Sequence, residues 1–274
     1  MRHSGIVLCG GKSSRMGRPK ALLPWRDGTL LETVVATLHR VVQDVVVVSS
    51  DAFELPPLAA RVVRDREPGL GPLAGIREGL HALGSGLAFV ASTDAPHLSA
   101  RFVEAMLSFD RAAALELDGH VQTLCAVYDA AHADTADELI AQQKMRPLFL
   151  LEASNFRLVS PDEVEDADSI RGFNRPEEYL AAVRASDRSG ASGGGVLEFF
   201  GRARRCAGRA RIDVPVATLG EVLKHAEPEL SIVREGEIAK QYLVSLNGRD
   251  FVRNPEIPIG PGDRVIVMDS GVGG

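Results

Sequence analysis

The sequence predicts an α/β protein with a mostly parallel sheet, followed by a small α+β domain. Over residues 1–184, short β-branched runs alternate with helical periodicity, which is typical of strands joined by crossover helices. A Gly/Ser-rich stretch, 185–195, then precedes a last segment, 196–274, in which strand patterns surround one helix. We therefore predict two domains joined by a flexible linker at 185–195.

The elements of the first segment follow one another at short intervals. Apolar strands are expected at 5–9, 45–48, 61–63 and 87–91, and helices from 29, over 72–83 and over 99–108. Thr29 and Glu32 form a capping-box pattern at the first helix. The uninterrupted valines at 45–48 favour a strand covered on both faces. Ligands of such folds bind beyond the carboxyl ends of the strands.

The last segment has a different order of elements. Strands are expected at 197–200, 211–214, 242–246 and 264–268, with one helix over 218–226. Asn247-Gly248 is typical of a type I′ hairpin turn. Strands around a single helix predict a small α+β roll.

Composition excludes several classes of function. Net charge is −6, which disfavours a nucleic-acid binder, because such proteins carry an excess of basic residues. No apolar run reaches the length of a membrane span, and the apolar stretch near the start is too short for a secretory signal. We expect a cytoplasmic protein without nucleic-acid or membrane partners. The three cysteines are far apart and the histidines have no metal-ligand spacing, which disfavours disulfide and zinc frameworks.

The most informative stretch is Leu8-Cys-Gly-Gly-Lys-Ser-Ser-Arg-Met-Gly-Arg-Pro-Lys20, directly after the first strand. Its paired glycines allow close backbone approach to a ligand, and consecutive amides there can cradle an anion. Arg15 and Lys20 add the positive charge that a polyphosphate needs. The spacing is neither that of a Walker A loop nor that of G-x-G-x-x-G.

This stretch resembles the G-G-x-S-x-R-M-G-x-x-K signature of molybdenum cofactor guanylyltransferases, the MobA-like nucleotidyltransferases. Three further segments resemble motifs of that family in the same order: Gly71-Pro-Leu-Ala-Gly75, Thr93-Asp-Ala-Pro96 and Phe173-Asn-Arg-Pro-Glu-Glu178. The resemblance spans residues 4–184 and implies a Rossmann-like nucleotidyltransferase fold. It implies transfer of GMP from GTP to the phosphate of molybdopterin or its metal-loaded form, with release of pyrophosphate.

The resemblance also implies roles for individual residues. Arg15, Lys20 and Asp94 would be catalytic, and Asp94 would bind Mg²⁺. The nucleotide would be bound by Leu8, Cys9, Gly10, Gly11, Ser13, Lys20, Asp65 and Asp94. Gly71 and Asn174 would contact the pterin substrate. Each polar candidate also has a structural alternative: an Asx turn for Asp94, a solvated loop charge for Asp65, and a helix N-cap with Glu177 at N3 for Asn174.

Guanine preference depends on weaker signals. Gly10 before Gly11 favours the guanylyl branch over the cytidylyl branch, which more often has Ala first. Asp65 matches a guanine-contacting carboxylate of the family. Ser49, Ser50 and Asp51 stand where an Asn often occurs, and Gly172 stands where the family often has a further Asn.

Residues 196–274 resemble the MoaD/ThiS sulfur carriers, which have a ubiquitin-like β-grasp fold. Leu197-Glu-Phe-Phe-Gly-Arg-Ala-Arg204 is similar to their first strand and turn, and Gly260-Pro-Gly-Asp-Arg-Val265 to the turn before their last strand. The resemblance implies adenylylation and thiocarboxylate formation at Gly274. It implies an activating adenylyltransferase and the large molybdopterin synthase subunit as partners.

Two alternatives stay open. The chain could be a sulfur carrier on a degenerate nucleotidyltransferase scaffold, although Arg15, Lys20 and Asp94 are all retained. It could also be an active enzyme that uses CTP, or a sugar phosphate as acceptor.

Overall fold

The computed structural model describes residues 3–10, 16–50, 54–67, 69–186, 194–227 and 229–270. These residues form two compact units. Unit 1 comprises 1–12, 19–22 and 29–172, and unit 2 comprises 13–18, 23–28 and 173–274. No helix among the described residues is long and apolar enough to cross a membrane.

Unit 1 is built on a seven-stranded sheet in the order β5-β4-β1-β6-β8-β7-β9. Its strands are β1 His3–Cys9, β4 Asp44–Ser49, β5 Arg61–Arg64, β6 Leu87–Ser92, β7 Ala113–Leu117, β8 His120–Asp129 and β9 Arg157–Val159. Every neighbouring pair is parallel except the two that involve β8. The mostly parallel Rossmann-like sheet predicted from the sequence is therefore confirmed.

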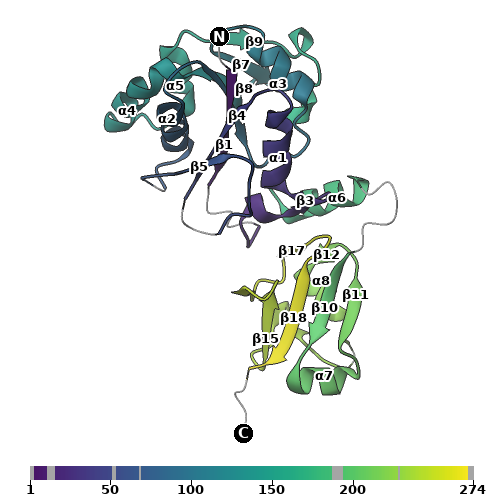
Figure 1. The fold of residues 1–274 in the computed structure, drawn as a ribbon. Coiled ribbons are helices and arrows are strands. Elements are labelled where there is room, and N and C mark those ends of the chain that lie inside the picture. The colour runs from purple at the N-terminus through teal and green to yellow at the C-terminus, as the bar shows by residue number, and fades with distance from the viewer. Residues whose placement is uncertain are drawn as a thin grey trace. The chain divides into compact units, whose positions relative to one another are not determined.

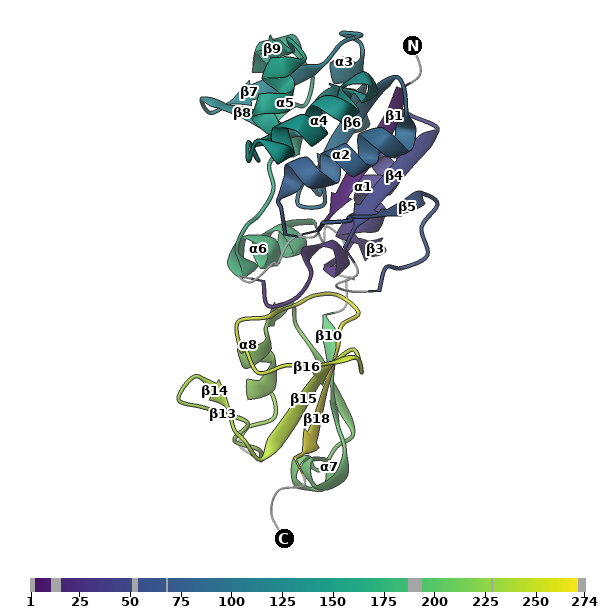
Figure 2. The same cartoon turned by 90° about the vertical axis from the view of Figure 1, so that its left-hand side faces the viewer.

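Helices cover both faces of this sheet (Figures 1 and 2). On one side lie α1 Leu30–His39 and α3 Ala100–Leu107; on the other lie α2 Pro72–Leu83, α4 Ala133–Ala141 and α5 Pro147–Ala153. Two apolar clusters follow from this layering, one centred on Phe89 and Phe102 and the other on Ile6 and Tyr128. The burial of both sheet faces explains why β4 is an unbroken run of valines.

Short-range signals located the first elements well. The predicted helix over 72–83 has those bounds, with Gly71 at φ +93° before it and Gly84 at φ +74° after it. The capping box of Thr29 and Glu32 is present at α1, and Ser99 caps α3. Close packing of α2 on β1 depends on Gly79, where a Cβ would lie 2.7 Å from Cγ2 of Ile6.

Unit 2 contains a five-stranded sheet in the order β11-β10-β18-β15-β16. Its strands are β10 Gly195–Phe199, β11 Arg211–Val214, β15 Tyr242–Leu246, β16 Asp250–Phe251 and β18 Arg264–Asp269. The central pair β10–β18 is parallel and the other pairs are antiparallel. Helices α6 Pro176–Ser186, α7 Gly201–Ala207 and α8 Leu219–Lys224 complete the longer elements of this unit.

Shorter pieces fill the connections. Two-residue strands are β2 Pro24–Trp25, β3 Gly28–Thr29, β12 Ala217–Thr218, β13 Val233–Arg234, β14 Glu237–Ile238 and β17 Pro258–Ile259. The 3₁₀ turns are η1 Lys20–Leu22, η2 Ala130–His132, η3 Pro161–Glu163 and η4 Ala167–Ile170.

The predicted α+β pattern of the last segment is largely present, with one correction. Residues 201–204, expected to form a turn after the first strand, are the start of helix α7. The Asn247-Gly248 turn has both residues at positive φ, 58° and 72°, as a type I′ hairpin requires.

Aromatic contacts hold residues 23–28 within unit 2. Trp25 packs against Phe173, with ring centroids 6.0 Å apart, and Phe173 packs against Tyr179. The Tyr179 hydroxyl donates to the carbonyl of Pro24 at 2.7 Å. These contacts seat residues 23–28 beside the start of α6.

A buried carboxylate, Asp263, organises the turn before β18. Both of its oxygens accept hydrogen bonds from the Arg18 guanidinium, at 2.6 and 3.2 Å. The Gly260 amide and the Asn247 side-chain amide also donate to it, each at 2.9 Å. Because a buried charge is costly unless fully paired, this set of donors explains how Asp263 tolerates burial.

Candidate functional site

The candidate site of unit 1 is the edge at which strands β5, β4, β1 and β6 end. These four strands are mutually parallel, so their carboxyl ends meet at the same edge. Gly10 follows β1, Ser50 follows β4, Asp65 follows β5, and Asp94 lies two residues beyond β6. Residues from distant parts of the sequence are thereby brought to one rim.

The glycine loop after β1 is described only at its start and after its end. Leu8 and Cys9 complete β1, and Gly10 is exposed, so that a Cβ added to it would meet no atom within 4 Å. This open space at the loop entrance suits close approach of a ligand. Gly11, Ser13 and Arg15, which are predicted site residues, lie outside the described residues.

Lys20 and Asp94 approach each other at this edge. Lys20 begins the 3₁₀ turn η1, and its Nζ lies 3.5 Å from Oδ2 of Asp94. The side chains are 18% and 36% exposed, so both are partly shielded and both still meet solvent. The pair offers a cation, which can bind a polyphosphate, beside a carboxylate, which can bind a divalent ion.

The backbone of Gly172 passes close to the carbonyl of Asp94. A Cβ added to Gly172 would lie 2.0 Å from the carbonyl oxygen of Asp94, so no side chain fits there. The family signature often has an Asn at this position. The structure supplies a reason for the glycine, because the chain before residue 173 passes directly against the Asp94 turn.

The donor set at Asp94 fits Mg²⁺. Magnesium is commonly bound by one or two carboxylates together with substrate phosphates and water. Asp94 offers one partly exposed carboxylate, and Lys20 is near its Oδ2 rather than enclosing the group.

Asp65 makes one hydrogen bond through its backbone and one through its side chain. Its amide donates to the Ser49 carbonyl at 2.9 Å, which continues the β4–β5 ladder by one residue. Its Oδ1 accepts from the Glu67 amide at 3.0 Å. Asp65 is half-buried, so it is more constrained than the solvated loop charge offered as its alternative.

Gly71 and Asn174 belong to different units. Gly71 precedes α2 at the positive φ that favours glycine, with Pro72 as the first helical residue. At the start of α6 the backbone amides of Asn174 and Arg175 donate to Glu178 Oε2, at 2.7 and 3.2 Å. The capping carboxylate is therefore Glu178 and not Glu177, because the helix begins at Pro176, one residue later than expected.

The cysteines of unit 1 are inert components of the core. Burial raises the pKa of the Cys9 thiol to about 12, against a smaller lowering by a hydrogen bond with Ser49. Burial also raises the pKa of Cys125 to about 12, and the negative charge of Asp94 adds to this. Neither thiol is ionised near neutral pH, so neither is a nucleophile there.

Among the described residues, one group of potential metal ligands is not indicated by any spacing in the sequence. His81, Asp134 and Asp137 place ligand atoms within 4.8 Å of one another on the exposed faces of α2 and α4. The carboxylate of Asp137 is already engaged, by His81 Nε2 at 2.6 Å and by Arg77 Nη1 at 3.4 Å. Both oxygens of the Asp137 carboxylate therefore already have partners within the protein.

Sequence patterns did not reveal the most buried charges near the site. Arg77 and Glu78 are 7% and 2% exposed, although they stand in the middle of α2 among apolar residues. Their only sequence signal is two adjacent charges in an otherwise apolar helix.

Comparison with known proteins decides the family. A family model described as the MobA-like NTP transferase domain matches residues 5–156. This chain belongs to the MobA-like nucleotidyltransferases. The nucleotidyltransferase predicted from the glycine-loop signature is thus confirmed.

Individual relatives agree with this family. A protein of Mycobacterium tuberculosis (strain H37Rv) named probable molybdenum cofactor guanylyltransferase is 36% identical over 185 residues, covering 63% of this chain and 92% of the relative. One of the same name from Bacillus thuringiensis (strain Al Hakam) is 31% identical, covering 67% and 96%. Among solved structures, molybdopterin-guanine dinucleotide biosynthesis protein A from Archaeoglobus fulgidus shares the fold, with a TM-score of 0.56, 23% identity, and coverage of 68% and 99%.

Proposed function

We propose that the domain of residues 1–184 transfers GMP from GTP to the terminal phosphate of molybdopterin, or of its metal-loaded form, and releases pyrophosphate. The observation that carries the proposal is the approach of Lys20 Nζ to Asp94 Oδ2 at the carboxyl edge of the sheet. Membership of the MobA-like family and relatives named molybdenum cofactor guanylyltransferase support the substrate pair.

The reaction needs charge neutralisation and alignment more than a protein nucleophile. A phosphate oxygen of the acceptor forms a bond to the α-phosphorus, and the bond from that phosphorus to the bridging oxygen breaks. The electron pair leaves with pyrophosphate. Lys20 stabilises negative charge on the triphosphate and on the leaving group, and Arg15 is assigned the same task from the sequence.

Asp94 would hold Mg²⁺, which when bound offsets charge on the phosphate oxygens. Residue 172 lies against the carbonyl of Asp94 and leaves no room there for a side chain, which only glycine satisfies. Asp65 is assigned to the base, because a carboxylate can accept from both N1–H and N2–H of guanine.

The direct test follows pyrophosphate release from the full chain with molybdopterin, Mg²⁺ and each of the four NTPs in turn. We expect turnover with GTP and little with the other three. Turnover confined to CTP would contradict guanylyl specificity and favour the cytidylyl alternative. Turnover with GTP and a sugar phosphate, but not with molybdopterin, would contradict the acceptor. No turnover with any NTP would favour the degenerate-scaffold alternative.

For residues 196–274 we propose a sulfur carrier of the MoaD/ThiS type, with Gly274 as the residue that is adenylylated and then converted to a thiocarboxylate. The observation that favours it is a sheet with a central parallel pair, β10–β18, flanked by antiparallel strands and by α8, which suits a ubiquitin-like β-grasp domain. Gly274 lies outside the described residues. The proposed partners are an activating adenylyltransferase and the large molybdopterin synthase subunit.

Intact-mass measurement tests the carrier. With an activating enzyme, ATP and a sulfur source, the full chain is expected to gain the mass of a thiocarboxylate. A variant lacking Gly274 should not gain it, and should keep its nucleotidyl transfer. An unchanged mass of the full chain under these conditions would contradict the carrier proposal.

A further inference from the structure

Helix α2 contains two adjacent buried charges, Arg77 and Glu78. They bind each other, with Arg77 Nη2 donating to Glu78 Oε1 at 2.7 Å. A buried ion pair is weak evidence for stability, because removing both charges from water offsets most of their attraction. Such a pair can instead fix the position of neighbouring groups.

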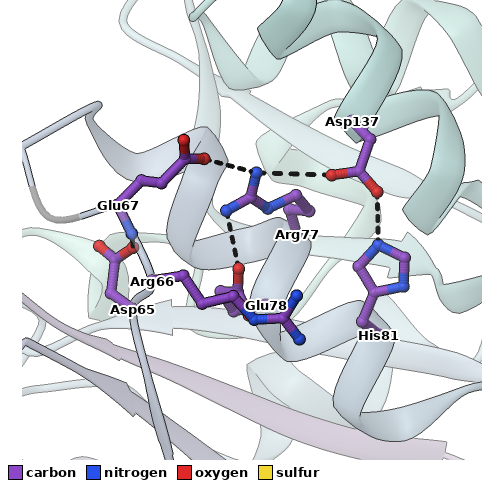
Figure 3. A network of polar contacts seen from close by, with 7 residues as sticks. All are labelled: Asp65, Arg66, Glu67, Arg77, Glu78, His81 and Asp137. Carbon is purple, nitrogen blue, oxygen red and sulfur yellow. Dashed lines mark hydrogen bonds and ion pairs between the residues drawn. The ribbon is translucent and has the colours of Figure 1, made fainter.

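Each member of the pair also holds a residue of the turn that follows β5 (Figure 3). Arg77 Nη1 donates to Glu67 Oε2 at 2.9 Å, and Glu78 Oε2 lies 3.2 Å from Arg66 Nε. Arg66 and Glu67 are both exposed residues of the turn. The charged ends of their side chains nevertheless contact the helix. The turn is thereby bound to α2 by two charged contacts of opposite polarity.

The nitrogen of Arg77 that donates to Glu67 also lies near a carboxylate of a second helix. This atom, Nη1, lies 3.4 Å from Oδ1 of Asp137 on α4, and the other oxygen of Asp137 contacts His81 (Figure 3). Burial lowers the pKa of Arg77, but the hydrogen bonds to Glu67 and Glu78 and the attraction of Glu78 and Asp137 outweigh this and raise it. The guanidinium therefore stays charged at any working pH.

The turn held in this way carries Asp65. The Glu67 amide, whose side chain is the one bound by Arg77, donates to Asp65 Oδ1. The orientation of the Asp65 carboxylate thus depends on where Glu67 sits, and Glu67 depends on Arg77. Two contacts, Arg77 to Glu67 and Glu67 to Asp65, therefore lead from the buried pair to the proposed base-binding carboxylate.

We infer that Arg77 and Glu78 are positioning residues for base specificity, acting through Glu67 and Arg66 on Asp65. The inference rests on the proposed function, in which Asp65 accepts from the guanine base. A recognition group gains selectivity when a supporting shell fixes its rotamer, because a displaced acceptor can no longer meet two donors at once. Neither Arg77 nor Glu78 touches the substrate; both act through the turn.

The test compares GTP with ITP, whose base lacks the N2 amino group. For the parent chain we expect kcat/KM for GTP to exceed that for ITP by about 10- to 100-fold, the size expected for a hydrogen bond to a charged group. Asp65→Ala should bring this ratio near one. Glu67→Ala, at an exposed position that leaves the backbone amide in place, should lower the ratio at least about threefold, chiefly through a higher KM for GTP.

Glu67 is chosen because Glu78→Gln would alter a buried pair and could prevent folding. The matched control is Glu165→Ala, which removes an exposed glutamate paired with Arg101 at 3.7 Å elsewhere in unit 1. It should leave the GTP/ITP ratio unchanged. If Glu67→Ala keeps the parent ratio while Asp65→Ala loses it, the inference is overturned and the proposed function stands. If the parent does not use GTP, or if Asp65→Ala keeps the ratio, the proposed role of Asp65 fails and the inference fails with it.

Discussion

The ammonium of Lys20 lies 3.5 Å from Oδ2 of Asp94, although one residue precedes the first helix and the other follows β6. Parallel packing of β1 beside β6 makes this approach possible, because both strands end at the same edge. The pair joins the end of the glycine-loop motif to the D-x-P turn.

Replacement of Lys20 by alanine should lower kcat/KM for GTP by about 10²- to 10³-fold, the cost of removing one donor aimed at developing charge. Steady-state pyrophosphate release measures this. Lys144→Ala, at an exposed position of the same unit, is the control and should leave kcat/KM unchanged. Equal activity of the Lys20 and Lys144 variants would remove Lys20 from the site.

Gly172→Ala should disturb Asp94 directly, since the added methyl would lie 2.0 Å from its carbonyl oxygen. Relieving such an overlap costs about 1–3 kcal/mol of unfolding free energy and shifts the Asp94 turn, so turnover should fall as well. Gly84→Ala provides a contrast, because its Cβ meets open space and only φ +74° is strained. We expect Gly84→Ala to lose stability but to keep turnover; loss of turnover in both would contradict the specific contact.

Thiol chemistry should separate the three cysteines at pH 8. The raised pKa values of Cys9 and Cys125, about 12 for each, keep both thiols neutral there, and a reactive thiolate would form only as pH approaches 12. Cys206 is exposed. Mass spectrometry after brief iodoacetamide treatment should find native protein modified at Cys206 alone and urea-unfolded protein modified at all three. Rapid native modification of Cys9 would contradict its burial.

Asp263→Ala should destabilise unit 2 by about 3–5 kcal/mol, because it leaves the Arg18 guanidinium without its buried partner. Fluorescence of Trp25, the single tryptophan of the sequence and buried within this unit, reports the unfolding transition in denaturant. Asp213→Ala, at a side chain that is 86% exposed, should shift the midpoint little. A small shift for both would show that Asp263 is not needed to pair Arg18.

Local signals predicted much of the fold and part of the site. Helix 72–83 was bounded correctly because Gly71, Pro72 and Gly84 determine its ends by backbone geometry alone. The apolar run of β4 likewise follows from burial on both faces. Strands β7, β8 and β9 and helices α4 and α5 were not predicted. The strands are joined in the order β6-β8-β7-β9, and that pairing depends on contacts that local periodicity does not contain.

For the candidate site, too, the sequence indicates the residues but not their arrangement. Motifs make Asp94, Lys20 and Asp65 candidates for the site. The distances between them could not be predicted, because they are set by strand order rather than by sequence distance. The close approach of Gly172 to the Asp94 turn and the burial of Glu78 do not follow from the local sequence. Gly172 matters through a backbone contact with the Asp94 turn, and Glu78 is covered when the turn after β5 folds back over α2.

The most direct measurement of the central claim is Mg²⁺-dependent pyrophosphate release from GTP and molybdopterin by Asp94→Ala beside the parent chain. Asp162→Ala, at an exposed position of unit 1, is the control. We predict that Asp94→Ala folds with the parent's melting temperature and loses Mg²⁺-dependent turnover by at least about 10²-fold, while the Asp162 variant keeps it. Turnover of Asp94→Ala equal to that of the parent, at the same Mg²⁺ concentration, would contradict the assignment of this edge as the active site.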